Sequence, residues 1–299
     1  MRRRSRFISV SASASSLPVK KRALRALEAL PPLSPVLHRV IASLVHEDVS
    51  FAKVAELIEK DTVLTGNILQ LVNSPLYGLQ GKVSSVRHAI AILGVHKLRN
   101  TVLGVSAAQM WRTVRTPAGW SMADFNRHSV SVAILADLLS QHLPAANAAG
   151  AFVAGLFHDL GLLLIAVGLP AEYRQISLLC EKDPHRAPEH ELEVLGTTHA
   201  ELCAEALAIW NLPAPICAAV RYHIRPELDP AACRTDEIAL SRLLHAANAY
   251  VAATSVSFCA MEDGTHGAAS SLESWGLGDR LPSVVGEFEN ELAAIQPYF

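Results

Sequence analysis

The longest apolar stretch of the chain, residues 151–169, carries His158 and Asp159 near its middle. Its length alone would suit a membrane-spanning helix. However, an aspartate at the centre of a bilayer costs about 2.5–3.5 kcal/mol, and the stretch also contains glycines and ends at Pro170. We therefore expect a buried helix in a protein core, where Asp159 must find a partner because an unpaired buried carboxylate is strongly disfavoured.

The composition and charge of the chain narrow its class. Hydrophobic residues make up 51% of the 299 residues and charged residues 18%, which is typical of a packed globular protein. The net charge of -2 gives no large positive field, so nucleic acid is not expected as the main partner. The one basic cluster of note lies at the extreme N-terminus, at Arg2, Arg3, Arg4 and Arg6.

Apolar residues recur at helical spacing along most of the chain, and no convincing run of alternating β-branched residues predicts a strand. We predict an all-α protein with a flexible tail at 1–17, one domain at 18–255, and a loose segment followed by a C-terminal helix at 256–299. Within the domain, a break near Pro117 separates an N-terminal helical subdomain, 18–118, from a second subdomain, 119–255. The expected helices from there on are 122–142, 148–166, 170–181, 188–210, 213–223, 236–254 and 281–295.

The first residues of the chain and its cysteines indicate the cellular compartment in which we expect the protein. The first residues are basic, but a Ser/Ala-rich stretch follows in place of the apolar region of a signal peptide. The cysteines are odd in number and show no C-x-x-C spacing, which favours small buried residues in a reducing compartment; they are Cys180, Cys203, Cys217, Cys233 and Cys259. We expect a cytoplasmic protein without a membrane segment.

Residues that could carry chemistry gather in the second subdomain. His128 precedes the His158-Asp159 pair, and His199, His223 and Asn248 follow it. Imidazoles and carboxylates are common ligands of first-row divalent metals, and a bound metal could activate water or polarise a phosphoryl oxygen. Alternatively, Asp159 accepts hydrogen bonds from His128 or from helix N-termini, with no metal.

Most other titratable residues suggest no site. Eight further histidines have no neighbours in sequence that suggest a site, and we expect them to lie at the surface or in packing positions. They are His38, His46, His88, His96, His142, His185, His190 and His266. The charged residues of the amphipathic helices are expected to form solvated faces.

Several motifs in this order resemble the HDOD family, the HD-related output domains of bacterial signalling proteins. They include LPPLSP at 30–35, VNSPLYG at 72–78, GLFHDLG at 155–161, HAE at 199–201 and WNLP at 210–213. The resemblance spans roughly residues 30–251. It implies an all-helical fold related to the HD phosphohydrolases, in a family regarded mostly as regulatory and linked to two-component and cyclic-dinucleotide systems. It also implies a divalent metal, Fe, Mn, Zn or Ni, at His128, His158 and Asp159.

The chain departs from the hydrolases of this superfamily at two positions. Asn248 stands where their final aspartate ligand is expected, and amide oxygen is a weaker, neutral ligand. Leu162 stands where the related phosphodiesterases carry a lysine, and their Gly-Tyr-Pro motif is absent. Both departures indicate a degenerate centre, so we assign no catalytic residue. His199 and His223 either complete a second metal position or are satisfied core residues.

We therefore predict a non-catalytic regulatory module that acts through contacts with signalling proteins of two-component or cyclic-dinucleotide pathways. One alternative is a metal-dependent phosphohydrolase or phosphodiesterase of the HD superfamily, because the first three ligands are retained. The other is a nucleic-acid-binding regulator, which only the arginine-rich tail supports.

Overall fold

The computed structural model describes residues 18–42, 55–56, 58–74, 79, 81–233, 237–254, 258 and 272–298. Within these residues the regular structure is helical, and strand-like pairing is limited to one isolated bridge between Ala145 and Ile238. The prediction of an all-α fold is confirmed. The expected flexible tail at 1–17 and most of the expected loose segment, residues 256–257 and 259–271, lie outside the described residues.

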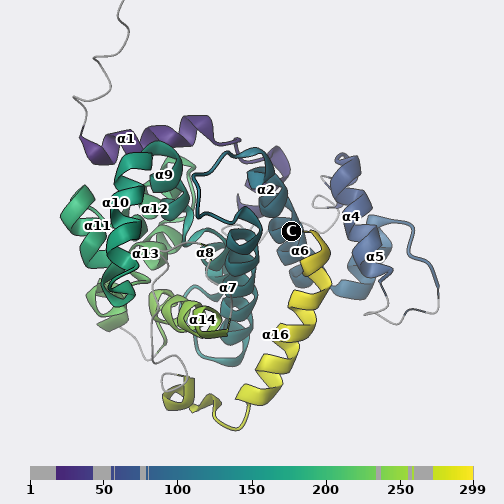
Figure 1. Cartoon of the computed structure of the whole chain (residues 1–299). Helices are drawn as coiled ribbons and strands as arrows, with labels where there is room; N and C mark the ends of the chain where they lie inside the picture. The colour runs from purple at the N-terminus through teal and green to yellow at the C-terminus, as the bar shows by residue number, and fades with distance from the viewer. Residues whose placement is uncertain are drawn as a thin grey trace, which may run out of the picture.

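The N-terminal part consists of short helices. They are α1 (Val19–Arg25), α2 (Pro35–Ala42), α4 (Thr62–Val72), α5 (Val86–Leu93) and the longer α6 (Val95–Met110). Side-chain caps begin three of them: Ser34 accepts a hydrogen bond from the first turn of α2, Asp61 from that of α4, and Ser85 from that of α5. α4 and α5 pack on α6 at one side of the molecule, while α1 packs on the far side against α9 and α12 (Figure 1).

The second part wraps its helices around α7 (Met122–His142) and α8 (Ala151–Phe157), which lie in the core. The others are α9 (Leu160–Gly168), α10 (Pro170–Cys180), α11 (Ala187–Leu195), α12 (His199–Ile209), α13 (Ala214–Tyr222) and α14 (Leu240–Thr254). The C-terminal α16 (Leu281–Ile295) runs along α7 and α6 (Figure 1). Before it, residues Glu273–Leu277 form a π-helical turn whose Leu277 is buried.

Two helices expected as continuous are each interrupted at the candidate site. The expected helix 148–166 breaks at His158 and Asp159, between α8 and α9. The expected helix 188–210 ends at Leu195, followed by Gly196 in the left-handed conformation (φ 69°), and restarts at His199, after the N-cap Thr198. Thr198 and Glu201 form a reciprocal capping box, a signal that is readable from the sequence.

The apolar stretch around His158 lies in the core, as expected. Among the described residues, Ala148–Gly168 is the one helical stretch long and apolar enough to cross a membrane, and 94% of its most apolar window is buried inside the fold. Cys180 and Cys203 are buried free thiols, and Cys217 is a partly buried one. Burial raises the pKa of the Cys203 thiol well above its usual range, which leaves it protonated and unreactive.

Candidate metal centre around Asp159

The carboxylate of Asp159 lies at the junction of α8 and α9, and four imidazole rings converge on it from four parts of the fold. Its Oδ2 lies 3.1 Å from Nε2 of His158 and 3.5 Å from Nε2 of His128, on α7. Its Oδ1 lies 3.7 Å from Nε2 of His199, the first residue of α12, and 3.7 Å from Nε2 of His223, at the C-terminal cap of α13. All five residues are between 0% and 3% exposed. Each carboxylate oxygen therefore faces two rings.

Close helix packing at two glycines brings these rings together. A β-carbon on Gly161 would lie 2.0 Å from the carbonyl oxygen of His199, so only glycine lets α9 approach the start of α12. A β-carbon on Gly155 would lie 2.5 Å from Cα of Ala133, which fixes the approach of α8 to α7. The two glycines of the GLFHDLG motif thus serve the geometry of the cluster.

The outer nitrogens of three rings are held by acceptors. Nδ1 of His158 donates to the carbonyl of Gly155 (2.8 Å), and Nδ1 of His223 donates to the carbonyl of Val220 (2.7 Å). Because a carbonyl oxygen only accepts, Nδ1 must carry the proton, and a neutral ring then presents the lone pair of Nε2 to Asp159. Nε2 of both rings is buried and makes no hydrogen bond among the described residues. With neutral rings, two acceptors face each other, an arrangement that a cation between them would resolve.

The third ring is held by a carboxylate that our sequence analysis missed. Nδ1 of His199 lies 2.7 Å from Oε1 of Glu191, and the backbone N–H of His199 donates to Oε2 at 2.6 Å. We expected the charged residues of the amphipathic helices to be solvated, but Glu191 is 0% exposed, so that expectation is wrong at this position. Its neighbour Glu193 lies at the surface of the same helix, and spacing alone does not distinguish the two.

Asp159 brings a buried negative charge into the cluster. Burial lowers the pKa of both His128 and His223 to about 4, although Asp159 opposes the shift, so these rings are neutral at neutral pH. Burial alone would raise the pKa of Asp159, but the adjacent rings, above all His158, more than offset this and hold it well below its usual range. Asp159 is therefore ionised, and the rings of His128 and His223 beside it are neutral.

The residues fit a divalent metal. His128, His158 and Asp159 form one group of ligand atoms that lie within 4.8 Å of one another, and Asp159, His199 and His223 form a second. Imidazole and carboxylate suit first-row transition ions, and metal-binding histidines commonly donate their other nitrogen to a carbonyl or a carboxylate, as here. Asp159 belongs to both groups and lies between them.

The structure also places Asn248 in the cluster. Its Oδ1 lies 2.9 Å from Nε2 of His128, so all six residues that the sequence suggested come together. Leu162, in place of the expected lysine, is buried in α9 and offers no charge. Near His128 the cluster is closed by the ring of Phe258, whose centroid lies 5.3 Å from that of the imidazole.

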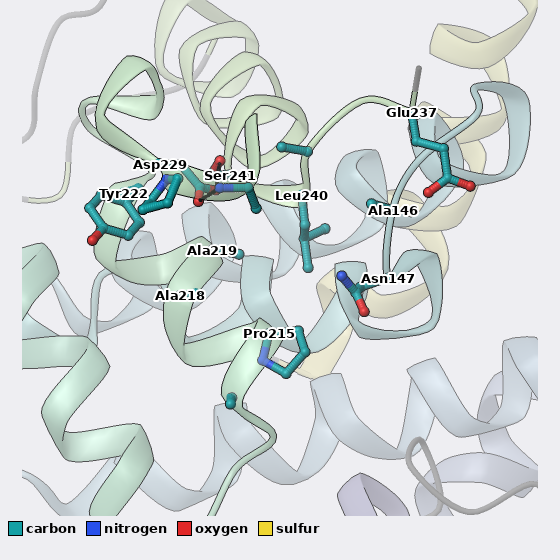
Figure 2. Close-up of a pocket in the computed structure, with 14 residues that line it drawn as sticks. Ala146, Asn147, Pro215, Ala218, Ala219, Tyr222, Asp229, Glu237, Leu240 and Ser241 are labelled. Atoms are coloured by element: carbon teal, nitrogen blue, oxygen red, sulfur yellow. Dashed lines mark hydrogen bonds between the residues drawn. The ribbon is translucent and has the colours of Figure 1, made fainter. Parts of the chain in front are cut away.

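A separate surface cavity of about 770 Å³ lies between α13, the start of α14 and the turn before α8 (Figure 2). Tyr222 and Ser241 lie at one end of it, where Ser241 Oγ donates to Asp229, and Glu237 and Asn147 lie at the other. None of the six cluster residues lines it, although Tyr222 directly precedes His223.

Comparison with solved structures shows the same fold. An HDOD domain protein of unknown function from Geobacter sulfurreducens has a TM-score of 0.73 at 24% identity, covering 94% of this chain and 98% of that one. A protein of Marinobacter aquaeolei VT8, provisionally named a signal transduction protein, has a TM-score of 0.72 at 21% identity, covering 94% and 64%. A Shewanella amazonensis SB2B protein, provisionally named a phosphohydrolase, has a TM-score of 0.70 at 23% identity, covering 93% and 97%.

Comparison with curated sequences gives one relative, an uncharacterized protein of Treponema pallidum (strain Nichols). It is 24% identical over 212 residues, which are 66% of this chain but only 38% of that protein. The family model of the HDOD domain matches residues 30–226 of this chain. These residues make up more than half of the chain and include every cluster residue except Asn248. The chain therefore belongs to the HDOD domain family.

Proposed function

We propose that this protein is a non-catalytic regulatory module that acts through contacts with other proteins and holds a divalent cation at Asp159 as part of its folded structure. The observation that carries the proposal is a cluster of metal-ligand type whose members are all buried. A hydrolytic metal centre needs an open coordination position that a substrate can reach. Here, the rings of His128, His158 and His223 are at most 1% exposed.

The two departures from the hydrolase pattern support the same proposal. Asn248 contributes no negative charge, and its side-chain amide already engages the Nε2 atom of His128. Leu162 cannot bind a phosphate, because it is aliphatic and buried. The cluster thus keeps the groups that hold a cation and lacks groups that would bind and activate a phosphate ester.

When bound, a divalent cation lowers the pKa of a coordinated water and polarises phosphoryl oxygens. The cluster residues of this chain would mainly orient the ligand atoms around the cation and connect the helices from which they come. Asp159, His199 and His223 come from the α8–α9 junction, α12 and α13, so a cation held by them ties three elements together. Since a ligand that binds only the folded state stabilises it, metal occupancy would set how firmly these helices are held.

The partners belong to the proposal as well. We infer signalling proteins of a two-component or cyclic-dinucleotide pathway, in the cytoplasm. The provisional name of the Marinobacter relative points to signal transduction, and the free thiols suit a reducing compartment.

A second candidate function is metal-dependent phosphohydrolysis. The observation in its favour is the convergence of His128, His158 and Asp159, the residues on which such chemistry would depend. One Shewanella amazonensis structure, with a TM-score of 0.54 at 18% identity, is provisionally named a metal-dependent phosphohydrolase.

The deciding experiment combines metal content with turnover. We expect near-stoichiometric metal by elemental mass spectrometry in the wild type and its loss in Asp159→Asn, with Asp279→Asn, an exposed aspartate, as control. Protein loaded with Mn²⁺ or Fe²⁺ should hydrolyse neither bis(p-nitrophenyl) phosphate nor cyclic dinucleotides faster than Asp159→Asn does. Turnover that Asp159→Asn abolishes and Asp279→Asn retains would establish the hydrolase instead.

A further inference from the structure

The two ligand groups that share Asp159 differ in charge. The group with His199 and His223 has a second buried carboxylate directly behind it, because Glu191 contacts the His199 ring. In the group with His128 and His158, the side chain that contacts the His128 ring is the neutral amide of Asn248, and it contacts Nε2, the nitrogen that faces Asp159. A dication needs compensating negative charge in a buried site, so the two groups cannot bind it equally.

Glu191 acts on His199 in two ways. Both of its oxygens face N–H groups of His199, at 2.6 Å and 2.7 Å, which is the arrangement expected of an ionised carboxylate. The contact fixes the proton on Nδ1 and directs Nε2 of the ring toward Asp159. It also makes Nε2 more basic, as outer carboxylates do for metal-binding histidines. His158 and His223 have only carbonyl oxygens in this position.

His128 is engaged differently. Its Nε2 atom, the one that faces Asp159, lies 2.9 Å from the side chain of Asn248. If the amide oxygen faces the ring, Nε2 carries a proton; if the amide is turned, its N–H donates to the Nε2 lone pair. In either orientation a cation must first break this contact between α7 and α14.

We propose that the cluster holds a single divalent cation on one side, at Asp159, His199 and His223, with Glu191 as the positioning residue for His199. The pair His128 and Asn248 remains an internal hydrogen bond that links α7 to α14. This inference rests on the proposed metal binding and adds where the ion lies and which carboxylate selects that side.

The test uses Co²⁺ on the full-length, chelator-treated protein, followed by visible absorption and by elemental mass spectrometry after desalting. We expect one equivalent bound in the wild type. Glu191→Gln should weaken Co²⁺ binding by about 10–100-fold, the usual effect of removing an outer partner, and Glu191→Asp should restore part of it. Glu193→Gln, which neutralises an exposed carboxylate on the same helix, should leave it unchanged.

Variants of the ligands separate the two sides. His128→Ala should still bind one equivalent with the Co²⁺ spectrum of the wild type, whereas His199→Ala and the more conservative His199→Gln should lose it. Circular dichroism confirms that each variant is folded. Asn248→Asp, which supplies charge to the other side, should raise the stoichiometry toward two.

Three results would overturn this inference alone. They are two equivalents in the wild type, loss of the ion in His128→Ala with retention in His199→Ala, or an unchanged affinity in folded Glu191→Gln. Absence of Co²⁺ binding would overturn both this inference and the metal binding on which it rests. One equivalent with the expected variant pattern, together with metal-dependent turnover, would overturn only the non-catalytic function.

Discussion

Two buried aspartates in neighbouring parts of the core, Asp137 and Asp159, have opposite surroundings. Asp137, on α7, accepts hydrogen bonds from the amides of Asn100 (2.8 Å) and Gln141 (2.9 Å), and its oxygens lie 2.8 Å and 3.0 Å from Nε2 of His96. In the part of the chain that the structure describes, imidazole nitrogens surround the two oxygens of Asp159, and the rings of His158 and His223, when neutral, turn lone pairs toward them.

The difference shows how burial alone fails to identify a site. Side-chain amide N–H groups can only donate, so Asp137 is satisfied by the protein and links α6 to α7 as a structural element. The rings of His158 and His223 donate their Nδ1 protons to carbonyl oxygens, so they can donate to Asp159 only as imidazolium ions, and burial opposes that state at His223. A carboxylate that the protein does not satisfy by itself is the one that needs a ligand.

The largest effect that we expect from this comparison is the response to acid. The folded-state pKa of His128 and of His223 is about 4, below the ordinary 6.5, so the unfolded chain binds more protons between pH 6.5 and pH 4. The free energy of unfolding is therefore fully retained above pH 6.5 and falls as the pH drops through this window. Urea unfolding of chelator-treated protein should show a loss of about 4 kcal/mol between pH 7.5 and pH 5 for the two rings together.

Single substitutions test whether the cluster causes this pH dependence of the free energy of unfolding. His223→Gln should remove about half of the dependence on pH, because the glutamine side chain does not titrate. His88→Gln, at an exposed position of α5, should leave it unchanged. A pH dependence that is the same in all three proteins would mean that the Asp159 cluster does not control acid stability.

The next effect compares the two aspartates directly. Asp137→Ala should lower the free energy of unfolding by about 2–3 kcal/mol, because it leaves the buried N–H of Asn100 without its main acceptor. Asp159→Asn in chelator-treated protein should change it by less than about 1 kcal/mol, since the new amide N–H can donate to a facing Nε2 lone pair. Urea unfolding at pH 7.5 measures both.

The reverse order would contradict the comparison. If Asp159→Asn cost more than Asp137→Ala in the absence of metal, the histidine rings would already satisfy Asp159 in the folded protein. The alternative that our sequence analysis left open, a hydrogen-bonded Asp159 without metal, would then be favoured.

The sequence predicted the fold class and the residues of the cluster. It predicted less well the carboxylates that contact the histidine rings. Motif order identified His158 and Asn248, because chemistry-bearing residues stand out in apolar helices. It missed Glu191, whose position resembles that of any solvated glutamate on an amphipathic helix. It also missed the partner of His96, which we expected at the surface or in packing, since Asp137 lies 41 residues away and only the packing of α6 on α7 joins them.

The smallest expected effect tests how far Asp137 depends on its imidazole. The His96 side chain is 48% exposed, and its nitrogens contact Asp137 and Arg99 near solvent. His96→Ala should lower the free energy of unfolding by only about 0.5–1 kcal/mol, because Asn100 and Gln141 still donate to Asp137. His88→Ala, at an exposed site without such a partner role, should change it by less than about 0.5 kcal/mol in the same urea experiment. A loss above about 2 kcal/mol for His96→Ala would mean that Asp137, like Asp159, depends on a group outside the amide network, and the distinction between a satisfied and an unsatisfied carboxylate would no longer hold.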